Sequence, residues 1–337
     1  MNVLVTGGAG FIGSNFVRYL LKTHADVRVV NLDKLTYAGN LDSLTDVSGD
    51  SRHSFVRGDI TDSRLVDSIL HEHRIDGILN FAAESHVDRS ILEPDVFVAT
   101  NVMGTHNLLF LAREHKLSRF LQVSTDEVYG SLGARGKFHE DTPLAPNSPY
   151  SAAKASADLL CRAYFRTFDF PVIVTRSSNN YGPCQFPEKL IPLMTINALE
   201  GRPLPVYGDG KHVRDWLHVE DHCRAIDLIF REGKPGEIYN IGGGCEKRNI
   251  DVVRHILKIL NKSDSLVRFV KERPGHDRRY AMDITRLRTE LNWRPAVDFD
   301  EGLRRTVRWY VENQSWWKRV VTGEYLKMYD RIYGSKG

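Results

Sequence analysis

Two short groups of polar residues have the types and spacing for acid–base chemistry. Thr125, Asp126 and Glu127 follow an apolar run, and Tyr150 precedes Lys154 by one helical turn. A tyrosine has a pKa of about 10, so it acts as a base near neutral pH only if a nearby cation lowers that pKa by roughly three units. Tyr150 and Lys154 therefore predict a base, although the same pair on an exposed helix would have no function.

The neighbouring carboxyl groups of Asp126 and Glu127 can divide acid and base roles if their environments separate their pKa values. Side chains alternate along a strand, so in a continued strand Asp126 would face away from Thr125 and Glu127. Joint action therefore requires the strand to end by Asp126. A solvated acidic turn is the alternative interpretation.

A glycine-rich segment near the start, TGGAGFIG over residues 6–13, predicts a phosphate site. It lies between an apolar run and a helix-length segment, where backbone N–H groups and the helix dipole attract a pyrophosphate. It can be read as GxGxxG from Gly8, Gly10 and Gly13, or as GxxGxxG from Gly7, Gly10 and Gly13.

Asp33 stands 20 residues after Gly13, at the end of the next apolar run. A carboxylate there accepts a hydrogen bond from a ribose 2′-hydroxyl and repels a 2′-phosphate, which favours NAD over NADP. Asp59 and Ile60 end the third run and are expected near the adenine, although a plain strand exit is an alternative. A turn rich in glycine followed by a capping aspartate is the non-functional interpretation of the whole pattern.

The elements that must position these groups alternate in type. Short apolar runs predict buried strands, and the segments between them have helical length, so we expect a parallel sheet covered on both faces. The expected strands are residues 2–5, 27–32, 54–56, 76–81, 120–124 and 172–175, and the expected helices are residues 11–22, 62–72, 95–115 and 151–168.

Five prolines within residues 183–205 interrupt this alternation and predict a second, smaller lobe. We expect a Rossmann-type, doubly wound α/β domain over residues 1–178 and a smaller α/β substrate-binding lobe over 179–337. A strand candidate at 237–241, after a helical stretch at 220–231, predicts that residues 213–243 return to the first domain.

Composition excludes several classes. The chain has 337 residues, 42% hydrophobic and 26% charged, with a net charge of +3 and interspersed signs. We therefore expect an ordinary globular protein without a nucleic-acid or membrane partner. Four widely spaced cysteines and no apolar span of 18 residues predict a cytoplasmic location. We assign no metal, because His71 and His73 lack the spacing of a helical zinc pair.

Together, TGGAGFIG, Asp33, STDEVYG (124–130) and YSAAK (150–154) resemble the extended short-chain dehydrogenases. Within them, the Thr-Asp-Glu run resembles the nucleotide-sugar 4,6-dehydratases, above all those acting on dTDP-glucose. Further similar stretches are AAESHVD (82–88), NNYGP (179–183), FPEKL (186–190), GDG (208–210), RDW (214–216) and RPGHD (273–277). Cys184 stands where such enzymes commonly carry an aromatic residue or histidine.

The resemblance implies a mechanism. Tyr150, beside Lys154, would remove the sugar O4 proton while NAD accepts the C4 hydride, and Thr125 would bond the developing carbonyl. Glu127 would then take the C5 proton while Asp126 protonates the departing C6 hydroxyl. Return of the hydride to C6 would give a 4-keto-6-deoxy sugar.

The resemblance also implies the binding residues. Those expected to hold NAD are Gly7, Gly10, Phe11, Ile12, Gly13, Asp33, Asp59, Ile60, Ala82, Ala83, Tyr150, Lys154 and Asn180. Those expected to hold dTDP-glucose are Ser85, Thr125, Asn179, Lys189, Leu190, Pro205, Tyr207, Arg214, Asn249, Arg273 and His276, of which Arg214 and Arg273 would bind the two phosphates. Surface positions for the cations, and core positions for Leu190 and Pro205, are the alternatives.

Related enzymes pair two long helices, so we expect a homodimer. Ala152, Ala155, Leu159 and Ala163 can form the apolar stripe, unless the monomer buries it. Three alternatives of function stay open: a dehydratase for UDP-glucose, CDP-glucose or GDP-mannose; a 4-epimerase; and an NAD-binding regulator without turnover.

Overall fold

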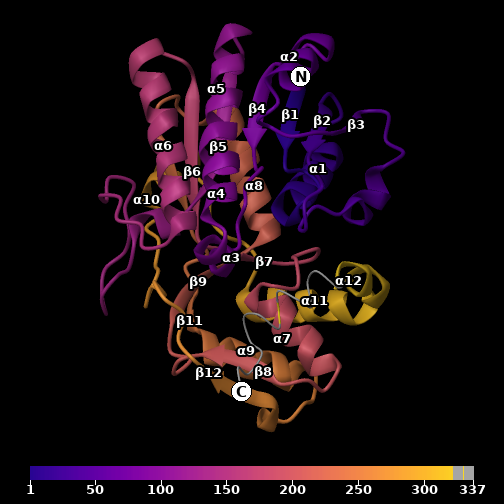
Figure 1. The fold of residues 1–337 in the computed structure, drawn as a ribbon, viewed down its shortest axis with the longest axis vertical. Coiled ribbons are helices and arrows are strands. Elements are labelled where there is room, and N and C mark those ends of the chain that lie inside the picture. The colour runs from indigo at the N-terminus through magenta and orange to yellow at the C-terminus, as the bar shows by residue number, and fades with distance from the viewer. Residues whose placement is uncertain (322–328, 330–337) are drawn as a thin grey trace.

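The computed structural model describes residues 1–321 and 329, and its largest element is a seven-stranded parallel sheet (Figure 1). The strand order is β10-β6-β5-β4-β1-β2-β3. The strands are β1 (Asn2–Thr6), β2 (Arg28–Asp33), β3 (His53–Arg57), β4 (Gly77–Asn80), β5 (Arg119–Thr125), β6 (Val172–Ser177) and β10 (Ile238–Ile241). This doubly wound α/β architecture confirms the predicted fold class.

Helices cover both faces of this sheet, which is why its strands read as nearly continuous apolar runs. On one face α1 (Phe11–Thr23) packs against α8 (Val219–Glu232). On the other face lie α2 (Ser63–Glu72), α5 (Thr105–Glu114) and α6 (Pro149–Phe168), side by side in that order. Separate hydrophobic cores therefore form on the two faces.

The expected helix over 95–115 is divided. It consists of α4 (Pro94–Phe97), a π-helical stretch η2 (Val98–Gly104) and α5, and it follows a short α3 (Val87–Leu92). Asn101, in the π-helical stretch, accepts a hydrogen bond from the backbone N–H of Glu84 and donates one to its carbonyl. A wider turn at this point therefore joins the helix to the loop after β4, an effect that apolar spacing does not reveal.

The second lobe lies below the large sheet in Figure 1 and has its own core. A three-stranded sheet in the order β11-β9-β7 and a two-stranded sheet of β12 and β8 belong to it. Its elements are β7 (Asn179–Tyr181), α7 (Leu190–Leu199), β8 (Leu204–Tyr207), β9 (Val213–His218), β11 (Glu246–Arg248), α9 (Asn249–Ile259), β12 (Val267–Val270), α11 (Phe299–Glu312) and α12 (Gln314–Val320). The remaining short helices are η1 (Leu41–Val47), η3 (Asp126–Tyr129), η4 (Asp264–Leu266) and α10 (Thr285–Leu291).

The chain crosses between the two parts more than once. Strand β10 pairs with β6 in parallel, so the candidate strand at 237–241 does join the large sheet. Residues 213–218 instead form β9, which pairs with β7 and β11 in the small sheet, so the returning segment begins only at α8. A division near residue 178 stays a prediction, and residues 322–328 and 330–337 of the expected lobe lie outside the described residues.

None of the helices within residues 1–321 combines the length and the apolar character that a membrane crossing requires.

Candidate active site

The loop between β1 and α1 is shaped by close backbone approaches. Gly7 has a φ of +69°, and a Cβ added there would lie 2.6 Å from the backbone nitrogen of Ala82. A Cβ on Gly13 would lie 2.2 Å from the carbonyl oxygen of Gly7. Gly7, Gly10 and Gly13 line a cavity and Gly8 does not, which favours the GxxGxxG interpretation. The open N-terminus of α1 fits the diphosphate of a dinucleotide.

Asp33, at the end of β2, fixes the loop that follows. Its carboxylate accepts hydrogen bonds from the backbone N–H groups of Leu35 (2.8 Å) and Ala9 (2.9 Å). Burial raises the pKa of Asp33, and these two hydrogen bonds oppose the rise. Lys34 forms an ion pair with Asp59 at 2.6 Å, which joins the ends of β2 and β3 beside the cavity.

The end of β5 meets the condition set by the sequence. The strand stops at Thr125, and Asp126 begins the short helix η3, so the backbone leaves the alternation of a strand at this residue. Thr125 accepts from the N–H of Glu127 and lies 3.3 Å from Asp126 Oδ1. As a result Thr125, Asp126 and Glu127 all line the cavity.

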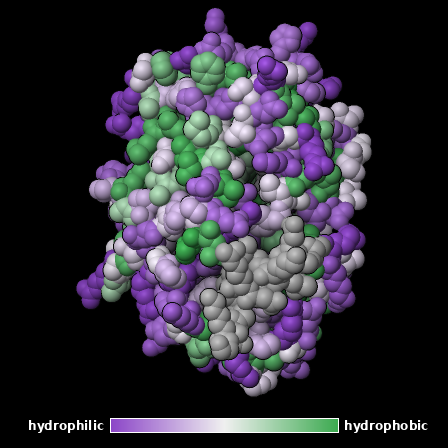
Figure 2. Space-filling view, in the orientation of Figure 1, coloured by the Kyte–Doolittle hydropathy of each residue, from purple (hydrophilic) through white to green (hydrophobic). Residues whose placement is uncertain are grey.

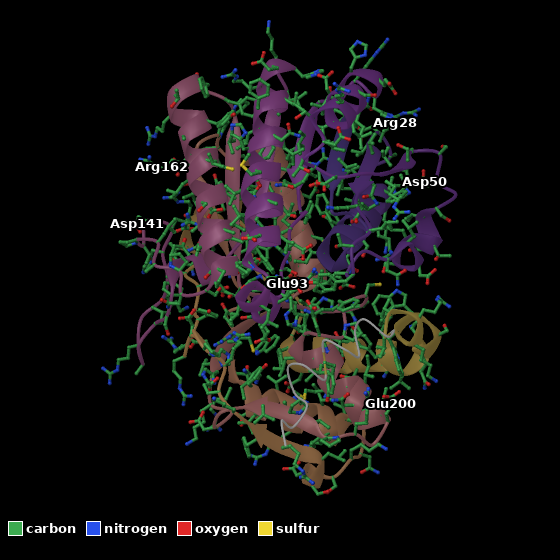
Figure 3. The ribbon with its side chains drawn as sticks, viewed as in Figure 1. Arg28, Asp50, Glu93, Asp141, Arg162 and Glu200 are labelled. Atoms are coloured by element: carbon green, nitrogen blue, oxygen red, sulfur yellow. The ribbon has the colours of Figure 1, made fainter. Side chains whose placement is uncertain are left out.

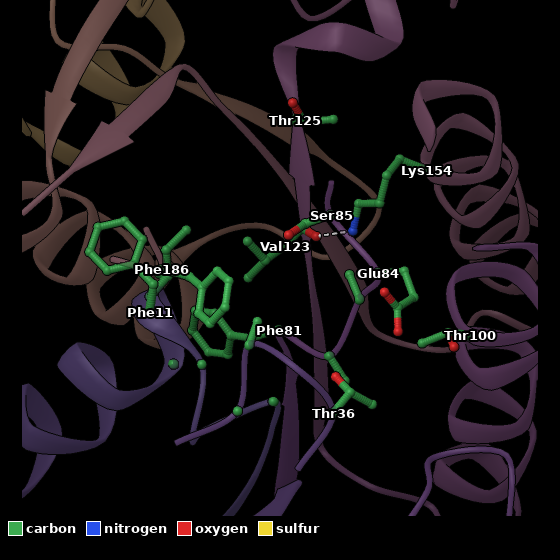
Figure 4. A pocket seen from close by; sticks show the side chains of 18 of the residues that line it. Phe11, Thr36, Phe81, Glu84, Ser85, Thr100, Val123, Thr125, Lys154 and Phe186 are labelled. Atoms are coloured by element: carbon green, nitrogen blue, oxygen red, sulfur yellow. Dashed lines mark hydrogen bonds between the residues drawn. The ribbon is translucent and has the colours of Figure 1, made fainter. Parts of the chain in front are cut away.

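The start of α6 brings Tyr150 and Lys154 to the same cavity. Ser148 and Ser151 form a capping box and Pro149 occupies the first turn, so the helix begins just before Tyr150. Lys154 Nζ donates to the carbonyl oxygen of Val123 at 2.6 Å, as Figure 4 shows. The ammonium is thereby held by β5 beneath the site.

Burial controls the pKa values of this pair. It raises the pKa of Tyr150 well above 10, with Glu127 adding to the rise and Thr125 opposing it. Burial also lowers the pKa of Lys154, and Asp158, one turn further along α6, opposes that fall. In these surroundings the phenol holds its proton until a positive charge or a proton acceptor reaches it.

The two carboxyl groups have different surroundings. Burial raises the pKa of Asp126 well above its usual range, and the charge of Glu127 adds to the rise. Burial also raises the pKa of Glu127, but Arg273, Arg214 and Lys189 oppose this. The arrangement therefore favours a protonated Asp126 as acid and an ionised Glu127 as base.

All the residues expected to hold the cofactor line this one cavity: Gly7, Gly10, Phe11, Ile12, Gly13, Asp33, Asp59, Ile60, Ala82, Ala83, Tyr150, Lys154 and Asn180. Ser85, Thr125, Asn179 and Lys189 of the expected substrate residues line it as well. Figure 4 shows Phe11, Phe81 and Phe186 on one side and Lys154, Glu84 and Thr100 on the other.

Seven expected substrate residues lie outside the lining of this cavity: Leu190, Pro205, Tyr207, Arg214, Asn249, Arg273 and His276. Several of them form a neighbouring cluster. Arg273 lies 5.9 Å from the ring of Tyr207, whose edge meets His276 with ring centroids 5.8 Å apart. Arg214 and Arg273 act on the Glu127 carboxylate, so the cluster lies close enough to influence the acid–base groups.

Within that cluster, Glu272 accepts from His276 Nδ1 at 2.6 Å and lies 3.5 Å from His212 Nε2. The two imidazole rings stack with centroids 3.8 Å apart. Burial and the surrounding arginines lower the pKa of His276.

Sequence reasoning missed several residues of the lining. The loop after Asp33 contributes Lys34, Thr36, Ala38 and Gly39, and other segments contribute Gly58, Glu84, Thr100, Gln185, Phe186 and Glu188. Glu84 and Glu188 lie in AAESHVD and FPEKL, so their segments were identified but their roles were not. Thr100 gave no signal, because the π-helical stretch that carries it is not visible in the spacing.

A parallel sheet with a glycine-rich β1–α1 loop, an acid ending β2 and a Tyr-x-x-x-Lys pair on α6 defines the extended short-chain dehydrogenases. Comparison with known proteins agrees. The sequence pattern of the GDP-mannose 4,6 dehydratase family matches residues 4–306. The chain is 54% identical to a dTDP-glucose 4,6-dehydratase of Xanthomonas campestris pv. campestris, over 96% of each chain. It is 49% identical to one of Salmonella typhimurium, over 99% of each chain.

Solved structures give the same result. A dTDP-glucose 4,6-dehydratase from Streptomyces venezuelae, with NAD and TYD bound, superposes with a TM-score of 0.92 at 52% identity, covering 95% of this chain and 100% of that chain. A UDP-glucose 4-epimerase from Thermotoga maritima superposes at 0.87 with only 30% identity, covering 93% and 100%. The chain belongs to the dTDP-glucose 4,6-dehydratase family.

Proposed function

We propose that this chain is a hydro-lyase that converts dTDP-glucose into dTDP-4-keto-6-deoxyglucose with bound NAD. The observation that carries the proposal is the end of β5 at Thr125, which turns Asp126 and Glu127 into the cavity that Tyr150 and Lys154 line. The fold is shared with 4-epimerases, so the fold alone does not favour dehydration. The carboxyl pair does, because elimination of water needs one acid and one base.

The cofactor fits the chain on structural grounds. Gly7 and Gly13 let the loop close on Ala82 and on itself, so that the uncapped N-terminus of α1 faces the cavity where the diphosphate would lie, and Asp33 would hold the ribose. Bound NAD supplies a reversible two-electron acceptor.

In the first step Tyr150 takes the proton from the sugar O4, and Thr125 donates a hydrogen bond to the developing C4 ketone. Burial keeps the proton on this phenol, and the Lys154 ammonium is held at the Val123 carbonyl. Tyr150 would therefore act as the base once its own proton has passed to an acceptor, a change that the positive charge arriving with the bound cofactor would favour. The ketone makes the C5 hydrogen acidic, which allows a carboxylate to remove it.

In the second step Glu127 takes the C5 proton and Asp126 gives its proton to the C6 hydroxyl, which leaves as water. Their different surroundings fit these opposite roles. A proton then returns to C5 from Glu127. The two electrons removed at C4 are regained at C6, so the net reaction is loss of water without net oxidation.

The decisive experiment supplies dTDP-glucose carrying deuterium at C4 to the purified protein. We expect the label at C6 of a 4-keto-6-deoxy product, within one molecule and without release of reduced cofactor. A parallel panel of UDP-glucose, CDP-glucose and GDP-mannose tests the choice of nucleotide. Recovery of only a C4 epimer would exclude dehydration, and binding of NAD without turnover of any sugar nucleotide would favour a regulator.

A homodimer is the assembly that the surface favours. Leu92, Val96, Met103 and Phe110 expose apolar side chains along α3 to α5, and Met103 is 58% exposed. On the adjacent α6, Leu159 is 56% exposed. Figure 2 shows green side chains gathered over these helices.

Ala152 and Ala163 of the expected stripe are also exposed, whereas Ala155 is buried in the monomer. Two copies can cover this face by a twofold pairing.

Light scattering of the double variant Met103→Lys/Leu159→Lys tests the dimer, and we expect it to be monomeric. Phe269→Lys is the matched control, because Phe269 on β12 is 59% exposed but lies on the second lobe. A double variant with the mass of the unaltered protein would exclude this face. A cytoplasmic location stays a prediction.

A further inference from the structure

A buried group of polar side chains that the proposed reaction does not use lies between the two sides of the cavity. Tyr37, in the loop between β2 and η1, donates to Glu188 Oε1 at 3.3 Å. The same oxygen lies 3.4 Å from Lys189 Nζ. One carboxylate oxygen therefore contacts a residue of the first lobe and a cation of the second.

The other oxygen of Glu188 lies near His86. His86 Nδ1 accepts a hydrogen bond from the backbone N–H of Arg89, so the neutral ring carries its proton on Nε2. That nitrogen lies 3.6 Å from Glu188 Oε2. The side chain of Glu188 is only 10% exposed, so its carboxylate lies in a confined space with Tyr37 and Lys189 at one oxygen and His86 near the other.

Tyr37 is held on its ring as well as at its hydroxyl. The guanidinium of Arg89 lies 5.0 Å from the ring centroid, and the ring of Phe186 meets it edge-on at 5.3 Å. Contacts on both the ring and the hydroxyl therefore tie the Tyr37 loop to Arg89, Phe186 and Glu188.

The two residues that Glu188 joins, Tyr37 and Lys189, belong to different binding surfaces. Thr36, Ala38 and Gly39, which flank Tyr37, line the cavity beside Asp33 on the cofactor side. Lys189 lines it on the side of Glu127, and its charge opposes the rise that burial causes in the pKa of Glu127. Lys189 Nζ also donates to the carbonyl oxygen of Ser85 at 2.7 Å.

We propose that Glu188 is a positioning residue that couples the two sites, so that a nucleotide sugar bound at Lys189 slows the release of the cofactor held by the Tyr37 loop. The inference rests on the proposed function. A ligand that fixes Lys189 also fixes Glu188, and Glu188 in turn keeps the Tyr37 loop closed against the cofactor. In terms of affinity, coupling of this kind acts in both directions, because linkage between two binding sites is reciprocal for their binding free energies.

The test measures the rate at which NAD leaves the loaded enzyme, with and without saturating dTDP. For the unaltered protein we expect dTDP to slow release about tenfold, which corresponds to an affinity coupling of ordinary size that acts through the dissociation rate. In Glu188→Gln the ion pair with Lys189 is lost, and we expect the effect of dTDP to fall below about twofold. Tyr37→Phe removes only the hydroxyl and is expected to weaken the coupling in the same direction, with an unchanged melting curve.

Glu93→Gln is the matched control. Glu93 pairs with Arg89 at 3.0 Å and is 42% exposed, so the change removes a negative charge from the same surroundings without removing a contact of Tyr37 or Lys189 with Glu188. Figure 3 places Glu93 near the junction of the two lobes. We expect this variant to keep the full effect of dTDP.

Three results would overturn the inference: no effect of dTDP on the unaltered protein, an undiminished effect in both Glu188→Gln and Tyr37→Phe, or an equal loss in Glu93→Gln. The assay needs binding but no turnover. A protein that shows the coupling yet forms no keto sugar would therefore exclude the proposed function and support the coupling.

Discussion

The two sides of the cavity are built in different ways. The cofactor side is largely backbone, because Gly7 and Gly13 approach their neighbours too closely for any side chain. The sugar side consists of side chains that separate segments supply, such as Glu127 from η3 and Tyr150 from α6. The first side should therefore be sensitive to added volume, and the second to a change of charge or proton.

Glu127→Gln tests the sugar side and should have the largest effect. The amide keeps the shape of the side chain but cannot take the C5 proton, so we expect the rate of dehydration to fall by about 10² to 10⁴. NAD content and the affinity for dTDP should change little. The measurement is turnover together with the exchange of solvent deuterium into C5, and exchange at the original rate would show that another group is the base.

Gly13→Ala tests the cofactor side. The new Cβ would lie 2.2 Å from the backbone oxygen of Gly7, which cannot move aside as a side chain would. We expect about 1–3 kcal/mol of strain, seen as a roughly 10- to 100-fold loss of NAD affinity. Gly133→Ala is the control, because a Cβ there meets nothing within 4 Å. Equal NAD affinity in both variants would show that close backbone packing at Gly13 is not needed to bind the cofactor.

The same contrast explains what the sequence could predict. The cofactor side lies within successive βα units, so the order of strand, glycine loop, helix and Asp33 was enough to identify it, and its expected residues line the cavity. For Asp126 and Glu127, the alternation of strand side chains gave a condition that the end of β5 meets.

The contacts of the second lobe were harder to predict from the sequence, since they join residues far apart in the chain. Glu188 meets Tyr37 and His86 from two other segments, and no local spacing reveals that meeting. Pro192 illustrates a related difficulty. From the sequence, it is one of the prolines that interrupt the alternation of strands and helices. In the structure it lies in the first turn of α7, where the backbone N–H that proline lacks is not needed for a helical hydrogen bond. The π-helical stretch at 98–104 depends on the contact of Asn101 with Glu84.

The smallest expected effect is a change in melting temperature, which tests whether Asp126, unlike Glu127, holds a proton. The pKa of Asp126 is raised above its unfolded value, chiefly by burial, so the native state binds a proton that the unfolded state releases. Stability is therefore fullest below the unfolded pKa and falls as the pH rises toward the folded pKa. Asp126→Asn mimics the protonated form and does not have this loss. We expect it to melt a few degrees higher than the unaltered protein at neutral pH, with no difference in acid, although it cannot supply the proton to the C6 hydroxyl.

Melting temperatures across pH check this, with Asp141→Asn as the control, an exposed aspartate labelled in Figure 3. A difference between Asp126→Asn and the unaltered protein that stays constant with pH would mean that the side chain is ionised in the folded state. Asp126 could not then be the acid. A difference that grows from acid to neutral pH would instead place the proton on Asp126 before the sugar binds, and would complete the division of roles with Glu127.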